Sequence, residues 1–224
     1  MTRASVRTIT AFLAWILSAA LTAQALAQPH SGQRPSFEDA EKWALLFDNP
    51  TRDAWQKPAE VIRALALSPN ATVADIGAGT GYFAVRIARA IPEGRVFGVD
   101  VEPNMVRYLA ERAGQEGLAN LTAVAGEPDD PRLPSAVDVA IMVDVYHHIG
   151  DRVRYFRNLR RYLKPGGRVA IIDHRRAPGD PPEAMFIAPS RVKAELKRAG
   201  YGVAAEYKFL PNQYLLIFKR PAAS

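Results

Sequence analysis

The sequence predicts an α/β fold, in which a mostly parallel β-sheet is covered by helices on both faces. Short apolar runs alternate with segments of helical periodicity through residues 58–200. The run Val137–Val143 is almost continuously apolar, which is typical of a strand that is covered on both faces. Two strand-like segments then follow one another at 201–209 and 213–219, and they predict an antiparallel hairpin that breaks the alternation.

The boundaries of the expected elements follow from apolar periodicity and from the residues at segment ends. Pro58 suits the first turn of a helix, residues 165–167 predict a turn, and Ser190 can cap a helix. Helices are expected at 37–47, from 58 onward, and at 82–90, 103–115, 152–163 and 190–199. Strands are expected at 72–77, 95–101, 121–125, 137–143, 168–173, 201–209 and 213–219.

Composition is that of an ordinary globular protein with a single domain. Of the 224 residues, 48% are hydrophobic and 23% are charged, and the formal net charge is +6. Cysteine is absent, which excludes disulfides, zinc–thiolate sites and cysteine nucleophiles. Lysine and arginine form no dense block comparable to a nucleic-acid-binding arm, so no nucleic-acid partner is expected.

The N-terminus has the pattern of a secretory signal peptide. Two arginines precede an apolar run at residues 9–23, and Ala25 and Ala27 are small residues suited to cleavage. The run is shorter than the roughly 20 residues that span a bilayer. We expect residues 1–27 to be cleaved, the mature protein to be periplasmic or secreted, and no stable membrane insertion to remain. An uncleaved anchor stays open, and a cytoplasmic location follows if the segment is no signal.

The segment Asp75-Ile76-Gly77-Ala78-Gly79-Thr80-Gly81 lies between an expected strand and an expected helix. Glycines at alternate positions allow a sharp turn and a close approach of the backbone to a ligand. Their spacing does not fit the dinucleotide pattern G-x-G-x-x-G, because Tyr82 stands where its last glycine belongs. A carboxylate at Asp75 would repel a pyrophosphate and attract an ammonium or sulfonium group. A tight turn without a ligand is the alternative.

Asp100 ends the next expected strand, about 20 residues past the glycines. An acidic residue at that distance can accept hydrogen bonds from both hydroxyls of a ribose. Because Pro103 begins a helix shortly afterwards, a helix cap is the alternative role.

Together these motifs resemble those of the class I S-adenosylmethionine-dependent methyltransferases, and the resemblance extends over residues 58–219. It implies a Rossmann-like, seven-stranded, mostly parallel sheet in the order 3-2-1-4-5-7-6, with an antiparallel last strand. It also implies the cofactor, S-adenosylmethionine. Residues 28–57 are then a linker and an N-terminal lid helix, 58–219 the methyltransferase domain, and 220–224 a tail. In the lid, Gln56 or Lys57 is a candidate for the methionine carboxylate.

The resemblance assigns roles to single residues of the cofactor site. The glycine segment wraps the methionine and ribose, Asp100 holds the ribose hydroxyls, and Val101 packs on the adenine. Glu127 stands where many members have an acid that reaches the adenine amino group, and Asp129 is the alternative, as is a solvated loop. The expected cofactor-binding residues are Asp75, Gly77, Ala78, Gly79, Gly81, Asp100, Val101, Glu127 and Asp144.

Residues 144–148, Asp-Val-Tyr-His-His, follow the expected fourth strand. Ligands bind at the carboxyl edge of open α/β sheets, and histidine can accept a proton near neutral pH. We expect His147 or His148 to be catalytic and the other to be structural, because neighbours leaving a strand point in different directions. Tyr146 is a candidate to face the sulfonium through its ring. A structural role for both histidines stays open.

Asp173 and His174 end the fifth expected strand. With Asp144 they resemble the metal ligands of catechol-type methyltransferases, but Asp-His replaces the Asp-Asn expected there, so no metal is expected. The predicted function is transfer of a methyl group to a small-molecule acceptor, and the missing cysteines disfavour an arsenite-type enzyme. An exported, non-catalytic S-adenosylmethionine- or nucleoside-binding protein is the alternative, and a nicotinamide oxidoreductase is the third. The sequence does not determine the oligomeric state.

Overall fold

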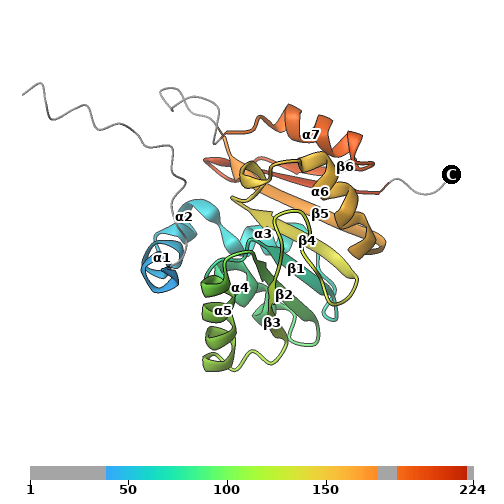
Figure 1. Ribbon diagram of the computed structural model, residues 1–224. Coiled ribbons are helices and arrows are strands. Elements are labelled where there is room, and N and C mark those ends of the chain that lie inside the picture. The colour runs from blue at the N-terminus through green and yellow to red at the C-terminus, as the bar shows by residue number, and fades with distance from the viewer. Residues whose placement is uncertain (1–38, 176–185, 221–224) are drawn as a thin grey trace, which may run out of the picture. The chain divides into compact units, whose positions relative to one another are not determined.

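The computed structural model describes residues 39–175 and 186–220 (Figure 1). The signal peptide expected at residues 1–27 lies outside the described residues, as do residues 221–224 of the expected tail at 220–224. The helices are α1 (Ala40–Phe47), α2 (Arg52–Gln56), α3 (Pro58–Leu65), α4 (Tyr82–Ala90), α5 (Pro103–Gln115), α6 (Arg152–Leu159) and α7 (Pro189–Arg198), with short 3-10 helices η1 (Tyr146–His148) and η2 (Arg160–Tyr162). The strands are β1 (Thr72–Ile76), β2 (Arg95–Asp100), β3 (Leu121–Ala125), β4 (Val137–Val143), β5 (Leu163–His174), β6 (Gly202–Tyr207) and β7 (Gln213–Lys219).

All seven strands form one sheet in the order β3-β2-β1-β4-β5-β7-β6. Strands β1 to β5 pair in parallel, whereas β7 is antiparallel to both β5 and β6. Both the order and the reversed last strand confirm the fold that the sequence predicts. The parallel strands end at a common edge, and this carboxyl edge is where α/β sheets bind their ligands.

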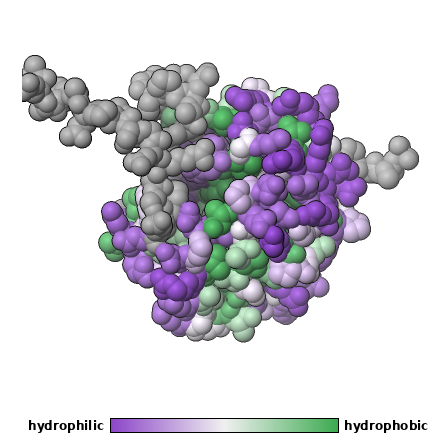
Figure 2. Space-filling view, in the orientation of Figure 1, coloured by the Kyte–Doolittle hydropathy of each residue, from purple (hydrophilic) through white to green (hydrophobic). Residues whose placement is uncertain are grey.

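Apolar side chains from the two faces of the sheet form two cores. One core joins the sheet to α3, α4 and α5, and the other joins it to α6 and α7. Val73 points into the first core and its neighbour Ala74 into the second, as the alternation of a strand requires. The outer surface of α6 and α7 is strongly hydrophilic, whereas hydrophobic side chains gather in the middle of the same view (Figure 2).

Helices α1 and α2, the first two of the three helices that precede β1, lie beside the carboxyl edge of the sheet (Figure 1). Helix α1 is tied to α5 by ion pairs from Arg107 to Glu41 at 3.1 Å and from Arg112 to Asp48 at 2.9 Å. These contacts fix α1 against α5, and Phe47 at the end of α1 lies next to Gly79 of the glycine segment. None of the helices within 39–175 and 186–220 is long and apolar enough to cross a membrane.

Several boundaries differ from the sequence predictions. Helix α6 ends at Leu159 and continues as η2, and β5 begins at Leu163, so the expected turn at 165–167 lies within this strand. The N-cap of α7 is Ala188 rather than Ser190, because Pro189 already supplies the fixed φ of a first turn. Helix α2 and η1 were not predicted, since segments of five and three residues are too short for apolar periodicity.

Candidate active site

The glycine segment at residues 77–81 connects β1 to α4 through three left-handed residues. The φ angles of Gly77, Gly79 and Gly81 are +74°, +54° and +96°, values that favour glycine. Its backbone N–H groups bond within the protein. Gly77 and Ala78 donate to the carbonyl of Val99 at 2.8 and 2.9 Å, and Gly79 donates to Asp100 at 2.8 Å. The segment therefore presents no row of free N–H groups to a phosphate.

The three glycines differ in what surrounds them. A Cβ at Gly77 would lie 2.2 Å from Val145, and one at Gly81 would lie 2.4 Å from Leu109. A Cβ at Gly79 would meet nothing nearer than the ring of Phe47, at 3.6 Å. Packing within the protein therefore requires glycine at 77 and 81, and only Gly79 faces the space between the segment and α1.

Asp75 is buried beneath the glycine segment. Its carboxylate accepts a hydrogen bond from the backbone N–H of Ala84, in the first turn of α4. Burial raises the pKa of Asp75 to about 7, and the Ala84 N–H and the charge of Arg52 oppose that rise. The carboxylate thus occupies a helix N-terminus that would otherwise be free to bind an anion.

Asp100, at the end of β2, joins the two neighbouring loops. One carboxylate oxygen accepts the N–H of Gly79 at 2.8 Å, and the other accepts the N–H of Glu102 at 3.0 Å. Burial raises the pKa of this carboxyl. Each oxygen keeps capacity for a further donor, because a carboxylate offers about four acceptor positions. Next to it, Val101 is 52% exposed, although most of β2 is buried.

Thr80 carries a polar atom without a partner. Its hydroxyl oxygen is buried in the glycine segment and forms no hydrogen bond with the described residues. Buried hydroxyls normally find a partner, so an unpaired one marks a place where a ligand group or a water fits. The glycine pattern around Thr80 is a sequence signal, whereas this threonine carries none.

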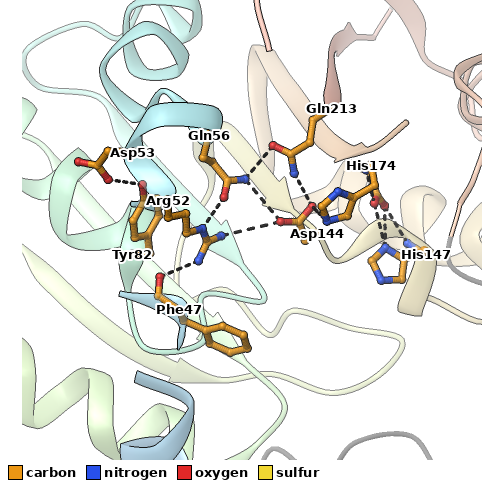
Figure 3. Close-up of polar contacts among 10 residues, drawn as sticks. Phe47, Arg52, Asp53, Gln56, Tyr82, Asp144, His147, His174 and Gln213 are labelled. Atoms are coloured by element: carbon orange, nitrogen blue, oxygen red, sulfur yellow. Dashed lines mark hydrogen bonds and ion pairs between the residues drawn. The ribbon is translucent and has the colours of Figure 1, made fainter. Parts of the chain in front are cut away.

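Helices α1 and α2 cover the site through Phe47 and Arg52. The ring of Phe47 lies over Gly79, and Arg52 donates to the Phe47 carbonyl at 2.8 Å. The Arg52 guanidinium stacks on the ring of Tyr82 at 4.1 Å and lies 3.8 Å from Asp144 (Figure 3). In the described part of the expected linker and lid, residues 39–57, the chain forms two short helices rather than one, and their role as a lid stays a prediction.

Asp144 is the centre of a polar cluster at the carboxyl end of β4 (Figure 3). It adopts a left-handed φ of +57° and accepts the side-chain N–H of Gln213 at 2.6 Å and of Gln56 at 3.4 Å. Nε2 of His174 lies 3.2 Å away. Burial raises the pKa of Asp144, and the charges of His174 and Arg52 oppose the rise. Gln56, one candidate for the methionine carboxylate, is bonded to Gln213 and Asp144 instead.

His147 is fixed by a buried carboxylate. Its Nδ1 lies 2.9 and 3.0 Å from the two oxygens of Asp173, and its backbone N–H donates to the same group at 3.2 Å. The ring of His148 lies against it, with 4.1 Å between centroids. The expectation that neighbouring side chains diverge is therefore wrong, because both residues belong to the tight turn η1 and not to an extended strand.

Tyr146 does not face the carboxyl edge, which corrects the expectation from the sequence. Its hydroxyl donates to Glu195 of α7 at 2.5 Å, and its ring packs on Phe156 of α6. The turn η1 directs this side chain into the core below α6 and α7. Glu127 lies on the other side of the site, half-exposed and paired with Arg132. Its loop is joined to β2 by a 2.9 Å bond from the N–H of Gly126 to the carbonyl of Asp100.

Comparison with known proteins decides the family. The model of a family described as "Methyltransferase domain" matches residues 67–208. The chain belongs to this family. It is 32% identical over 142 residues to phosphoethanolamine N-methyltransferase 1 of Triticum aestivum, covering 63% of this chain and 27% of that relative. It is 34% identical over 110 residues to an arsenite methyltransferase of Halobacterium salinarum, covering 48% of this chain and 28% of that relative.

A solved structure shares the fold of this methyltransferase domain. A SAM-dependent methyltransferase from Aquifex aeolicus superposes with a TM-score of 0.73 and 24% identity, covering 83% of this chain and 98% of that one. The chain thus combines membership of the methyltransferase family with the fold of a SAM-dependent methyltransferase. It spans little more than a quarter of the two curated relatives, so their substrates do not transfer to it directly.

The residues of this methyltransferase fit the cofactor. Asp100 has free acceptor capacity, Val101 offers an exposed apolar surface, and the Thr80 hydroxyl lacks a partner. Among the residues at 39–175 and 186–220, no three His, Asp or Glu side chains are placed to hold a metal ion together. The candidate metal ligands Asp144, Asp173 and His174 belong to two separate pairs. Asp173 is paired with His147, and Asp144 is paired with His174.

Proposed function

We propose that this chain transfers the methyl group of S-adenosylmethionine to a small-molecule acceptor. The observation that carries the proposal is the way the glycine segment is bonded. The N–H groups of Gly77, Ala78 and Gly79 are bonded to Val99 and Asp100, and Asp75 accepts the Ala84 N–H in the first turn of α4, so a pyrophosphate finds few donors and an unfavourable charge. The nicotinamide alternative is disfavoured by its pyrophosphate, whereas a cofactor with a ribose, a cationic sulfur and no phosphate suits the same surroundings.

The cofactor half of the site comprises the carboxyl ends of β1 and β2 with the glycine segment. Here Asp100 would hold the ribose hydroxyls, Val101 would pack against the adenine, and Gly79 would leave room for the chain of the methionine. Glu127 would take the adenine amino group, since its loop is anchored to β2. Asp75 would support the site from below rather than touch the cofactor, because its carboxylate is turned to α4.

The acceptor half comprises the carboxyl ends of β4 and β5, with α2 above them. Bound S-adenosylmethionine supplies a methyl group on a positively charged sulfur, which is an activated leaving group. The chain's task is therefore alignment, and well-oriented reactants gain about 7–11 kcal/mol over free ones. Arg52 and Gln56 of α2 and Gln213 of β7 hold Asp144 in place through contacts from two separate elements. His147 supports the floor of this half through its bond to buried Asp173.

A small molecule is proposed as the acceptor, and arsenite is disfavoured. The chain has no cysteine, whereas arsenite-type enzymes rely on thiols. We propose that the acceptor approaches along the edge of β4 and β5, where Asp144 and His174 lie. We also propose residues 58–219 as the catalytic domain and 28–57 as linker and lid.

Export is proposed on the sequence pattern of residues 1–27 alone. A periplasmic or secreted methyltransferase would need S-adenosylmethionine outside the cytosol, where it is made. N-terminal sequencing of the natural protein tests this. A mature chain that begins near Leu26 or Gln28 supports export. An intact Met1 or Thr2 in a cytosolic fraction contradicts it, and the difficulty of cofactor supply then disappears.

Calorimetry with three ligands tests the proposed activity. We expect the chain without residues 1–27 to bind S-adenosylmethionine and S-adenosylhomocysteine at one site and not to bind NAD. Methyl-labelled S-adenosylmethionine and a mixture of small metabolites then report turnover. Cofactor binding without any labelled product would support the non-catalytic alternative, and binding of NAD alone would contradict the proposal.

A further inference from the structure

Two aspartate–histidine pairs cross between the ends of β4 and β5. His147 follows β4 and is bonded to Asp173 of β5, whereas His174 ends β5 and lies against Asp144, which follows β4. The pairs differ in exposure. The side chain of His147 is 5% exposed, and that of His174 is 36% exposed. Only the second pair therefore combines a fixed ring with access from outside.

We propose that His174, held by Asp144, accepts the proton of a hydroxyl group carried on a planar aromatic acceptor. This inference rests on the proposed function and names both the acceptor class and a catalytic residue for it. The sequence pointed instead to His147 or His148. His147 is unsuited because Asp173 takes its Nδ1 and the protein encloses the ring.

The hydrogen bonds around Asp144 determine which nitrogen of His174 carries hydrogen. The Asp144 carboxylate is surrounded by donors: the side-chain amide of Gln213 at 2.6 Å, that of Gln56 at 3.4 Å, and the guanidinium of Arg52 at 3.8 Å. A carboxylate only accepts, and Nε2 of His174 lies 3.2 Å from it as an ion-pair contact, so this contact favours a hydrogen on Nε2. In a neutral ring Nδ1 then has a free lone pair, and no residue within the described ranges bonds to it.

Aromatic rings flank His174 on two sides. The ring of Trp55, from α2, lies 6.3 Å from it at an angle of 31°, and the ring of Phe186 lies 6.5 Å away at 79°. Both rings are partly exposed, so their free faces or edges favour a planar guest that can stack on them. An aromatic alcohol placed there brings its hydroxyl to the exposed side of His174.

In the proposed reaction, proton transfer to His174 accompanies transfer of the methyl group to the acceptor oxygen. The acceptor's O–H bond breaks and its proton passes to Nδ1 of His174. The oxygen forms a bond to the methyl carbon, and the carbon–sulfur bond breaks with its electron pair left on sulfur. The resulting imidazolium is stabilised by Asp144, with Arg52 and Asp173 as the other charged groups that face this pair.

A chromogenic phenol tests the inference without turnover. The probe is 4-nitrophenol, whose phenolate absorbs visible light, added to the full mature chain saturated with S-adenosylhomocysteine. We expect a saturable gain of phenolate on binding. His174→Gln should lose this gain and retain its affinity for S-adenosylhomocysteine, because glutamine can still donate to Asp144 but cannot take up the proton. His148→Gln, the matched control at the same edge, should keep the gain.

Three results would overturn the inference: no saturable gain in the unmodified chain, an equal gain in His174→Gln, or loss of the gain in His148→Gln. Failure to bind S-adenosylhomocysteine would instead contradict the proposed function. Nitrogen-15 NMR of the unmodified chain gives a second readout that needs no variant. His174 hydrogenated on Nε2 supports the inference, and a ring hydrogenated on Nδ1 contradicts it.

Discussion

The cofactor half and the acceptor half occupy the same sheet edge but are built differently. In the cofactor half, backbone groups of nearby segments meet carboxylates, as where Gly79 donates to Asp100, 21 positions along the chain. In the acceptor half, side chains from distant segments meet one another. Gln56 bonds to Gln213 across 157 positions, and Gln213 bonds to Asp144 across 69. Local backbone geometry defines the first half, and tertiary packing defines the second.

The two halves also hold their carboxylates in different ways. Asp75 and Asp100 accept hydrogen bonds from backbone N–H groups, which carry no net charge. Asp144 and Asp173 face histidine or arginine side chains, so their environment changes when a partner is replaced. Substitutions in the cofactor half should therefore act through backbone geometry and ligand contacts, and those in the acceptor half through unpaired buried charge.

The largest contrast is expected between two glycines of the same segment. Gly79→Val should abolish binding of S-adenosylhomocysteine, because its branched side chain fills the space below Phe47. Gly77→Ala should destabilise the fold by about 2–5 kcal/mol, since a Cβ in a left-handed residue also collides with Val145. Calorimetry and urea unfolding separate the two effects. Equal losses of stability with unchanged binding in both variants would remove the distinction between the glycines.

Asp100→Ala is expected to weaken binding of S-adenosylhomocysteine by about 2–3 kcal/mol, or roughly 30- to 150-fold. The physical reason is the loss of two charge-assisted hydrogen bonds to the ribose. Asp100→Asn is the matched control, because it keeps the shape and retains one acceptor oxygen, so its loss should be smaller. Unchanged affinity in a folded Asp100→Ala variant would reject the ribose assignment.

His147→Ala should cost about 1–3 kcal/mol of stability, because it leaves buried Asp173 without its side-chain donor. Affinity for S-adenosylhomocysteine should stay close to that of the unmodified chain, since this pair lies in the acceptor half. Chemical denaturation and calorimetry measure the two quantities. His148→Ala serves as the comparison, with a smaller expected loss of stability because His148 is exposed. The reverse order would contradict a structural role for His147.

A further expected effect concerns pH and Asp75. Its pKa is about 7 in the folded chain against 3.8 for the free group, so between these values the folded state holds a proton that the unfolded state releases. Stability from this group is full below pH 3.8 and is lost as the pH rises to about 7. Asp75→Asn should reduce that decline, and urea unfolding across the window measures it. Parallel pH dependences in the two proteins would show that Asp75 is not the source.

Much of the fold and half of the site could be predicted from the sequence. The alternating elements, the strand order implied by the resemblance and the reversed β7 are confirmed. The positions of Gly79 and Asp100 follow from the turn after β1 and the end of β2, which are local features. Their predicted contacts with the cofactor stay predictions, as do those of Glu127 and Asp144.

The acceptor half could not be predicted because its geometry depends on tertiary contacts. A single unforeseen turn, η1, directs Tyr146 into the core and brings His147 and His148 together. No periodicity signals that Gln56 and Gln213 are buried partners, since isolated glutamines are ordinary surface residues in a sequence. The unpaired state of the buried Thr80 hydroxyl could not be predicted either, because the lack of a hydrogen-bond partner is a property of the folded chain.

A crystal structure of the mature chain with S-adenosylhomocysteine tests the central claim most directly. We expect the ligand in the cofactor half, above Gly79, with its ribose hydroxyls bonded to Asp100 and its adenine against Val101. A ligand bound elsewhere, with the carboxylate of Asp100 still bonded only to the N–H groups of Gly79 and Glu102, would contradict it.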